Sequence, residues 1–153
     1  MDRFLIVTNG GKDTDHSVTA KVKSLLTEAG KTCILCQKDE KKNIIRESIP
    51  EDLDCAVVIG GDGSLIEVAR LLWKRDVPVL GINMGTVGYL TEVEVSHIDQ
   101  AIRQIAAGDF EVEDRMMLEG SFEGQKEDVA LNDIVVCRKG ELRVIHFRLY
   151  VNG

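Results

Sequence analysis

Val57-Val58-Ile59-Gly60-Gly61-Asp62-Gly63-Ser64-Leu65 joins an apolar run to an amphipathic one through a glycine-rich turn. The apolar residues that lead into the turn, 55–59, predict a buried strand. The residues that follow it, 64–72, carry apolar side chains at helical spacing and predict a helix. Glycines let a ligand approach the backbone closely, and a helix start offers N–H groups and a positive dipole end. The sequence therefore predicts a turn that suits phosphate.

One carboxylate, Asp62, stands inside this turn. A simple phosphate-binding loop has no use for a negative charge there. A kinase does, because a base or an acceptor for a ribose hydroxyl must stand beside the phosphates. The alternative is that Asp62 only caps the helix that follows. The local sequence leaves both interpretations open.

The composition bounds the class of protein. The 153 residues suffice for a domain with a sizeable core, and 44% apolar with 29% charged residues is ordinary for a globular protein. The net charge of −7 disfavours nucleic acid and anionic membranes as main partners. No apolar run reaches membrane-spanning length and no signal-type segment follows Met1, so we expect a cytoplasmic protein.

The first third of the chain predicts a β-α-β unit. Residues 4–8 and 32–36 are strand-like, and the helix between them, 16–29, has Thr14 or Asp15 as its cap and Gly30 as its end. Such a unit implies parallel strands and a right-handed crossover. The loop after the first strand, Asn9-Gly10-Gly11-Lys12, lacks the Walker spacing and could be a phosphate loop or a plain mobile loop.

A second glycine-rich loop follows the strand predicted over residues 76–83, which ends at Asn83. It contains Gly85 and Gly88, and Tyr89 beside it could stack on a base or be a half-buried loop aromatic. A helix is expected over 95–107, capped by Ser96. Two glycine-rich loops at the carboxyl ends of two strands would face one crevice, where open α/β sheets bind ligands.

The periodicity changes after residue 107. Long strands are predicted over residues 110–122, 129–138 and 142–151. We therefore expect an α/β domain over residues 1–107, and the first strands of a β-rich domain over residues 108–153. The whole is an α/β protein with a Rossmann-like open parallel sheet and helices on both faces. Asn132-Asp133 is either a bulge or, as we favour, a polar pair presented to a ligand.

The chain stops on Asn152-Gly153, a hairpin signal with no returning strand, which predicts a C-terminally truncated fragment. The four cysteines are expected to be buried, reduced thiols. Cys33 and Cys36, three apart on a strand, should face opposite sides of the sheet and so should not share a metal.

Three segments together resemble the N-terminal signatures of the NAD kinase family: Gly60–Ser64, Gly81–Leu90 and Leu131-Asn132-Asp133. The resemblance implies transfer of the γ-phosphoryl of ATP, with Mg²⁺ or another divalent cation, to the 2′-hydroxyl of the adenosine ribose of NAD, giving NADP. It implies that Asp62 accepts the proton. The implied nucleotide-binding residues are Gly60, Gly61, Asp62, Gly63, Ser64, Asn83, Gly85, Tyr89, Asn132, Asp133 and Arg143, with no protein metal site.

The expected partners are therefore NAD and ATP, with the chain assembling as a homo-oligomer and binding neither nucleic acid nor membrane. Family members continue into a β-rich part with a Thr-Gly-Ser-Thr-like segment that this chain does not match, so the isolated chain is expected to be inactive. One alternative is a nucleotide-binding module without turnover. Another is a diacylglycerol-type lipid kinase, which the acidic balance and the 85–90 loop disfavour. The sequence does not distinguish ATP from polyphosphate, or NAD from NADH.

Overall fold

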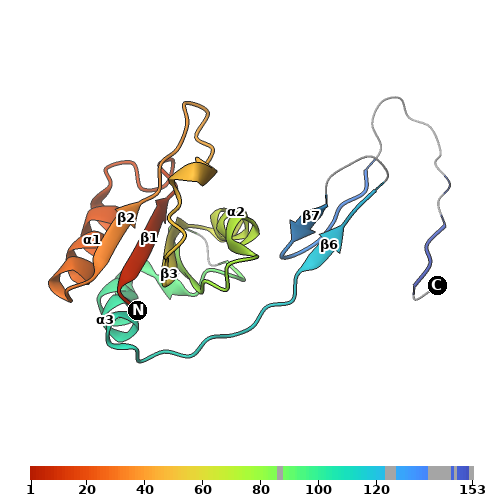
Figure 1. Cartoon of the computed structure of the whole chain (residues 1–153). Helices are drawn as coiled ribbons and strands as arrows, with labels where there is room; N and C mark the ends of the chain where they lie inside the picture. Colours follow the sequence, from red (N-terminus) through yellow and green to blue (C-terminus); the bar gives the residue numbers. More distant parts are fainter. Residues whose placement is uncertain (86–87, 123–126, 138–145, 147, 152–153) are drawn as a thin grey trace.

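The computed structural model describes residues 1–85, 88–122, 127–137, 146 and 148–151 (Figure 1). Its centre is a five-stranded, all-parallel sheet with the strand order β2-β1-β3-β4-β5. This confirms the predicted Rossmann-like α/β fold. The strands are β1 (Arg3–Thr8), β2 (Thr32–Leu35), β3 (Cys55–Gly60), β4 (Val79–Asn83) and β5 (Val93–Glu94).

Helices cover both faces of this sheet. One apolar cluster joins α1 (Ser17–Glu28) and α3 (Ile98–Ala107) to Phe4, Ile6 and other strand residues. The other cluster joins α2 (Asp62–Leu72) to the opposite face. Successive residues of a strand point to opposite faces, so two buried faces require an unbroken apolar run. All six residues of β3 are buried, as its sequence predicts.

The start of α1 differs from the prediction. The helix begins at Ser17, and Asp15 accepts a hydrogen bond only from the backbone and hydroxyl of that residue. The main acceptor is Asp13, which is 1% exposed and accepts from the N–H groups of Val18 and Thr19. The chain turns between Asp13 and the helix, which brings the earlier carboxylate under the first turn. The end of the helix is confirmed, because the residue after its C-cap, Gly30, has a φ of 76°.

The start of α3 also differs. A short 3₁₀ turn, η2 (Val95–His97), precedes the helix, and Ser96 makes no cap. Its hydroxyl instead contacts the side chains of Glu94 and His97. The buried face is as predicted, with Ile98, Ile102 and Ile105 in the core.

The strands predicted after residue 107 are largely wrong for the described residues. The structure contains a short antiparallel pair, β6 (Leu118–Gly120) and β7 (Asp128–Ala130), whereas residues 110–117 and 131–137 are not in strands. Half of the third predicted strand, 142–151, lies outside the described residues, and its described residues are not in a strand. A strand needs a hydrogen-bonding partner, and alternating apolar residues alone do not supply one. Several of these residues are instead exposed: Val112, Phe122, Val135, Val136, Leu149 and Val151.

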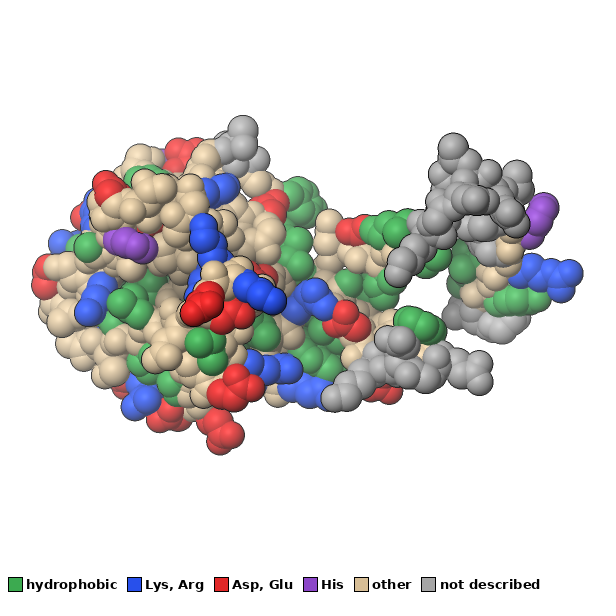
Figure 2. Space-filling view, turned by 90° about the horizontal axis from the view of Figure 1, so that it is seen from above, with side chains coloured by type: hydrophobic (Ala, Val, Ile, Leu, Met, Phe, Trp, Pro, Cys, Tyr) green, Lys and Arg blue, Asp and Glu red, His purple; other side chains and the backbone are tan. Residues whose placement is uncertain are grey.

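A cavity of about 820 Å³ lies where the α/β part meets the residues that follow it. Its walls include Leu65 and Ala69 of α2, Leu80 of β4, and Phe110 and Met117 of the extended segment after α3. Figure 2 shows apolar side chains gathered at this junction and along the projecting C-terminal part. In the described part of the chain, no helix is long and apolar enough to cross a membrane.

The cysteine predictions hold in part. Cys33 packs against the cluster of α1 and α3, whereas Cys36 packs against the cluster of α2, so the two side chains face opposite sides. Burial raises the pKa of Cys55 to about 12, which keeps this thiol protonated. Cys137 is exposed, contrary to the expectation of a buried thiol.

We predict that Ile102→Ala destabilises the fold by about 2–5 kcal/mol, because it leaves a cavity between α3 and the sheet. Ile102 is fully buried, whereas Gln100 on the same helix is exposed. Urea unfolding should therefore show a large loss of stability for Ile102→Ala and almost none for Gln100→Ala. Similar losses for the two variants would contradict the described packing of α3.

Candidate active site

The carboxyl ends of β1, β3 and β4 carry the candidate site. From β1 the chain crosses to β2 on one side, whereas from β3 it proceeds to β4 on the other side (Figure 1). The point between β1 and β3 is therefore the place where the strand order reverses. Open α/β sheets bind ligands in the crevice outside such a switch point. The loop after β1 and the glycine-rich turn after β3 border this crevice, and the loop after β4 adjoins them.

Hydrogen bonds hold the first two loops together. The N–H of Asn9 donates to the carbonyl of Ile59 at 2.8 Å, and the Asn9 side chain donates to the Ser64 hydroxyl at 3.3 Å. A Cβ on Gly60 would lie 2.6 Å from that hydroxyl oxygen, so the close packing requires glycine there. Asn9 was not among the predicted site residues. Its sequence signals were its position directly after a buried strand and its place in the possible phosphate loop Asn9-Gly10-Gly11-Lys12.

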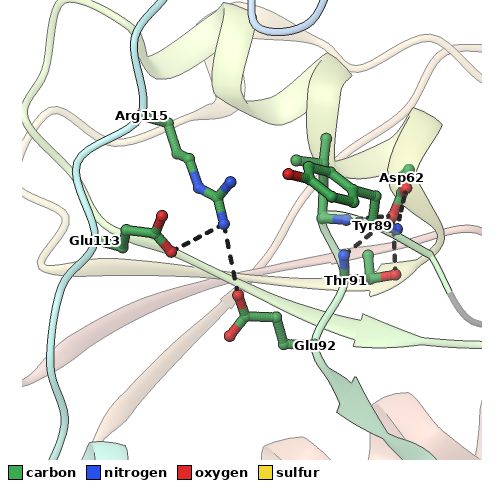
Figure 3. Close-up of polar contacts among 7 residues, drawn as sticks. Asp62, Tyr89, Thr91, Glu92, Glu113 and Arg115 are labelled. Carbon is green, nitrogen blue, oxygen red and sulfur yellow. Dashed lines mark hydrogen bonds and ion pairs between the residues drawn. The ribbon is translucent and has the colours of Figure 1, made fainter.

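Asp62 connects the turn after β3 to the loop after β4 (Figure 3). Its Oδ2 accepts from the N–H of Tyr89 at 2.7 Å. Its Oδ1 accepts from the N–H groups of Leu90 and Thr91 and from the Thr91 hydroxyl, at 3.0–3.1 Å. The α2 N-cap residue is Gly61, without a side-chain cap bond. Asp62 therefore does not serve as the cap that the simpler interpretation required.

These contacts set the charge of Asp62. Burial alone would raise its pKa, but hydrogen bonds from the N–H groups of Tyr89, Thr91 and Leu90 and from the Thr91 hydroxyl outweigh burial. Donors of this kind stabilise the ionised form. The pKa of Asp62 is therefore below its ordinary value, and the side chain is a carboxylate at neutral pH.

Gly88 and Thr91 complete this arrangement. A Cβ on Gly88 would overlap the Asp62 carboxylate, at 2.7 Å from its Cγ, and would lie 2.7 Å from the Thr91 hydroxyl. Thr91 is 3% exposed, so its hydroxyl is committed to the carboxylate. Sequence reasoning identified Gly88 as a tight bend or a close approach to a ligand, and it missed Thr91. The available signal was a small polar residue directly after the glycine-rich loop.

The remaining predicted residues divide into two groups. Asn83 is buried at the end of β4, Gly85 follows with a φ of 144°, and the ring of Tyr89 is 82% exposed beside them. Asn132 and Asp133 are exposed after the end of β7. Among the described residues, no hydrogen bond or ion pair joins this pair to the glycine-rich loops, and neither residue lies in a strand or bulge. Arg143 lies outside the described residues.

We predict that Gly88→Ala costs about 1–3 kcal/mol of stability, because the new methyl group must displace Asp62 or Thr91. The melting temperature should fall by several degrees. Gly10→Ala is the matched control, since nothing lies within 4 Å of its Cβ position. An unchanged melting temperature in Gly88→Ala would show that the loop moves away from Asp62 without cost.

We also predict that Thr91→Val raises the pKa of Asp62, because the carboxylate loses a hydroxyl donor, whereas Thr91→Ser should leave it nearly unchanged. Carboxyl ¹³C NMR during a pH titration measures this directly. The folded-state pKa of Asp62 lies below the unfolded value of about 3.9, so its charged form stabilises the fold above that pH. The stability difference between the native chain and Thr91→Val should thus shrink as the pH falls through the folded-state pKa. Identical titration curves would contradict the hydroxyl contact.

Comparison with known proteins points to one family. A family model described as the ATP-NAD kinase N-terminal domain matches residues 4–110. A curated NAD kinase of Lachnospira eligens is 38% identical over all of this chain, and one of Citrifermentans bemidjiense is 39% identical over 90% of it. The chain spans 56% and 48% of the lengths of these two relatives.

Solved structures agree on the fold. An NAD kinase from Archaeoglobus fulgidus in complex with ATP superposes with a TM-score of 0.54 at 25% identity, covering 76% of this chain and 39% of that one. Yeast NADH kinase complexed with NADH superposes with a TM-score of 0.66 at 14% identity, covering 85% and 46%. The glycine-rich turns around Asp62 thus stand in a chain that belongs to the ATP-NAD kinase family.

Proposed function

We propose that the protein containing this chain transfers the γ-phosphoryl group of ATP to the 2′-hydroxyl of the adenosine ribose of NAD, giving NADP and ADP. The observation that carries the proposal is the position of an ionised Asp62 in a glycine-rich turn at the switch point of the sheet. Membership of the ATP-NAD kinase family supports it.

In this proposal Asp62 accepts the proton from the attacking hydroxyl. The bond from the 2′-oxygen to the γ-phosphorus forms, and the bond from that phosphorus to the β–γ bridging oxygen breaks, so ADP leaves with the electron pair. Among the described residues, Oδ1 already accepts from three donors, whereas Oδ2 accepts only from the N–H of Tyr89. Oδ2 therefore retains the capacity to accept a ribose hydroxyl. Its low pKa makes it an orienting acceptor that takes the proton late.

The N–H groups of Ser64 and Leu65 donate to the carbonyl of Gly61, whereas those of Asp62 and Gly63 have no backbone acceptor among the described residues and would bind phosphate oxygens. The exposed ring of Tyr89 would stack on adenine. On the family resemblance we assign nucleotide contacts also to Gly60, Gly61, Gly63, Ser64, Asn83 and Gly85. We also propose that an α/β domain over residues 1–107 is followed by a NAD-binding region over residues 108–153. On the family resemblance alone, we assign NAD contacts in that region to Asn132, Asp133 and Arg143.

Mg²⁺ would enter with ATP. The described residues contain no group of three or more His, Cys, Asp or Glu side chains that could enclose a metal. This suits Mg²⁺, which is commonly held by substrate phosphates, waters and at most one or two carboxylates. The ion would neutralise charge on the phosphates. We further propose a cytoplasmic location and a homo-oligomer, whose assembly would cover exposed apolar residues such as Val135 and Val136.

We predict that Asp62→Asn lowers kcat for NADP formation by about 10²–10⁴-fold, the usual cost of losing a general base. The assay uses a chimera in which residues 1–153 are joined to the part of the Lachnospira eligens NAD kinase outside the matched region. Asp76→Asn is the matched control, because Asp76 is an exposed carboxylate beyond the opposite end of α2.

Near-normal kcat in Asp62→Asn would refute the assigned role of Asp62. A chimera that binds ATP and NAD but forms no NADP would favour a nucleotide-binding module without turnover. Phosphorylation of diacylglycerol in place of NAD would favour a lipid kinase.

A further inference from the structure

Lys12 lies between the two glycine-rich loops. Its Nζ is 2.8 Å from the position that a Cβ would take on Gly61, and 3.6 Å from that position on Gly85. A Cβ on Gly61 would crowd the ammonium group, whereas the distance at Gly85 is an ordinary van der Waals contact. The amine thus reaches from the loop after β1 across the switch-point crevice, to the start of α2 and the loop after β4.

The backbone that carries Lys12 is well anchored. The N–H of Lys12 donates to the carbonyl of Asn9 at 2.9 Å, and the side chain of Asn9 accepts from the N–H of Gly11. The next residue, Asp13, is buried against the first turn of α1. The loop is therefore an ordered turn, which favours a phosphate loop over a plain mobile loop.

The positive charge of Lys12 is not compensated within the described part of the chain. No ion pair or hydrogen bond involves its ammonium group there, whereas Lys21 and Lys31 pair with Asp99 and Asp2. The carboxylate of the site, Asp62, accepts hydrogen bonds from residues 89–91. The positive dipole end of α2 adds to the same field. A lysine beside a helix start, without a carboxylate partner, attracts an anion.

We propose that Lys12 is a phosphate-binding residue that contacts the polyphosphate chain of the phosphoryl donor. The assignment rests on the proposed function only in naming ATP as that donor. A strongly hydrated ammonium point charge suits a chain of phosphates, which offers several oxygens at varying positions. In this arrangement the Lys12 ammonium group contacts the phosphates of the donor, and the Asp62 carboxylate contacts the hydroxyl of the acceptor. The same chemistry fits inorganic polyphosphate, and the pyrophosphate of NAD is the competing anion.

The test measures binding to the 153-residue chain by isothermal titration, with inorganic tripolyphosphate, ATP, adenosine and NAD as separate probes. Lys12→Met should lower the affinity for tripolyphosphate and for ATP by about tenfold to a hundredfold, as expected for losing one hydrogen bond between charged groups. The affinities for adenosine and for NAD should change by less than about threefold. The Lys12→Arg variant should retain most of the affinity for tripolyphosphate. The melting temperature should not change, because the amine has no described partner to lose.

Lys74→Met is the matched control, since Lys74 lies beyond the opposite end of α2, over the ring of Trp73. Equal losses in Lys74→Met, or unaltered tripolyphosphate binding in Lys12→Met, would overturn the assignment. Weaker NAD binding with unaltered ATP binding would place the amine on the acceptor and would also overturn it. The assignment would also be overturned if the native chain did not bind tripolyphosphate at millimolar concentration. Tighter binding of ATP than of tripolyphosphate identifies the nucleotide as the source of the phosphates.

None of these probes requires NADP to form. A chimera without kinase activity would therefore overturn the proposed function and leave the Lys12 assignment standing. Unaltered tripolyphosphate binding in Lys12→Met would overturn the assignment and leave the proposed function standing.

Discussion

The hydrogen bonds between the Asp62 carboxylate and residues 89–91 join the turn after β3 to the loop after β4. A half-buried carboxylate must be compensated, and here three N–H groups and one hydroxyl do so. This requirement accounts for features that look unrelated in the sequence. Gly88 has no side chain because the carboxylate occupies that space, and Thr91 is buried because its hydroxyl is a donor. The loop after β4 takes its form from Asp62, the first residue of α2.

The sheet explains why these loops meet at all. Both faces of the parallel sheet are covered by helices, so a ligand can approach only at an edge of the layers. The strand order reverses between β1 and β3, and α1 and α2 cover opposite faces of the sheet, which is the arrangement at whose carboxyl edge open α/β sheets bind ligands. At this point the Lys12 ammonium group lies beside Gly61 and Gly85, whereas the Asp62 carboxylate, on the first residue of α2, is bonded to the loop after β4. A phosphoryl donor carries negative charge, which suits the ammonium group, whereas a hydroxyl acceptor must lose a proton, which suits the carboxylate.

The residues after α3 relate to this site differently. Their described contacts with the α/β part include the ion pair between Arg70 of α2 and Asp128 of β7, and the walls of the apolar cavity. Asn132 and Asp133 are near neither glycine-rich loop by any described contact, although the family resemblance assigns them to NAD. The chain spans about half the length of the relatives it matches. How the NAD half of the site is formed therefore stays a prediction.

The sequence by itself determined the order and type of the α/β elements other than the short β5, the end of α1 at Gly30, the buried face of α3 and the family. These properties depend on the spacing of apolar residues, glycines and short motifs along the chain, so short stretches of sequence are enough to predict them. The tertiary structure decided what each polar group contacts. Asp62 finds its donors 27–29 residues away, and the Lys12 amine meets Gly61 and Gly85 only because β1, β3 and β4 are neighbours. The long strands expected after residue 107 failed for the same reason, since a strand exists only where a partner strand lies beside it.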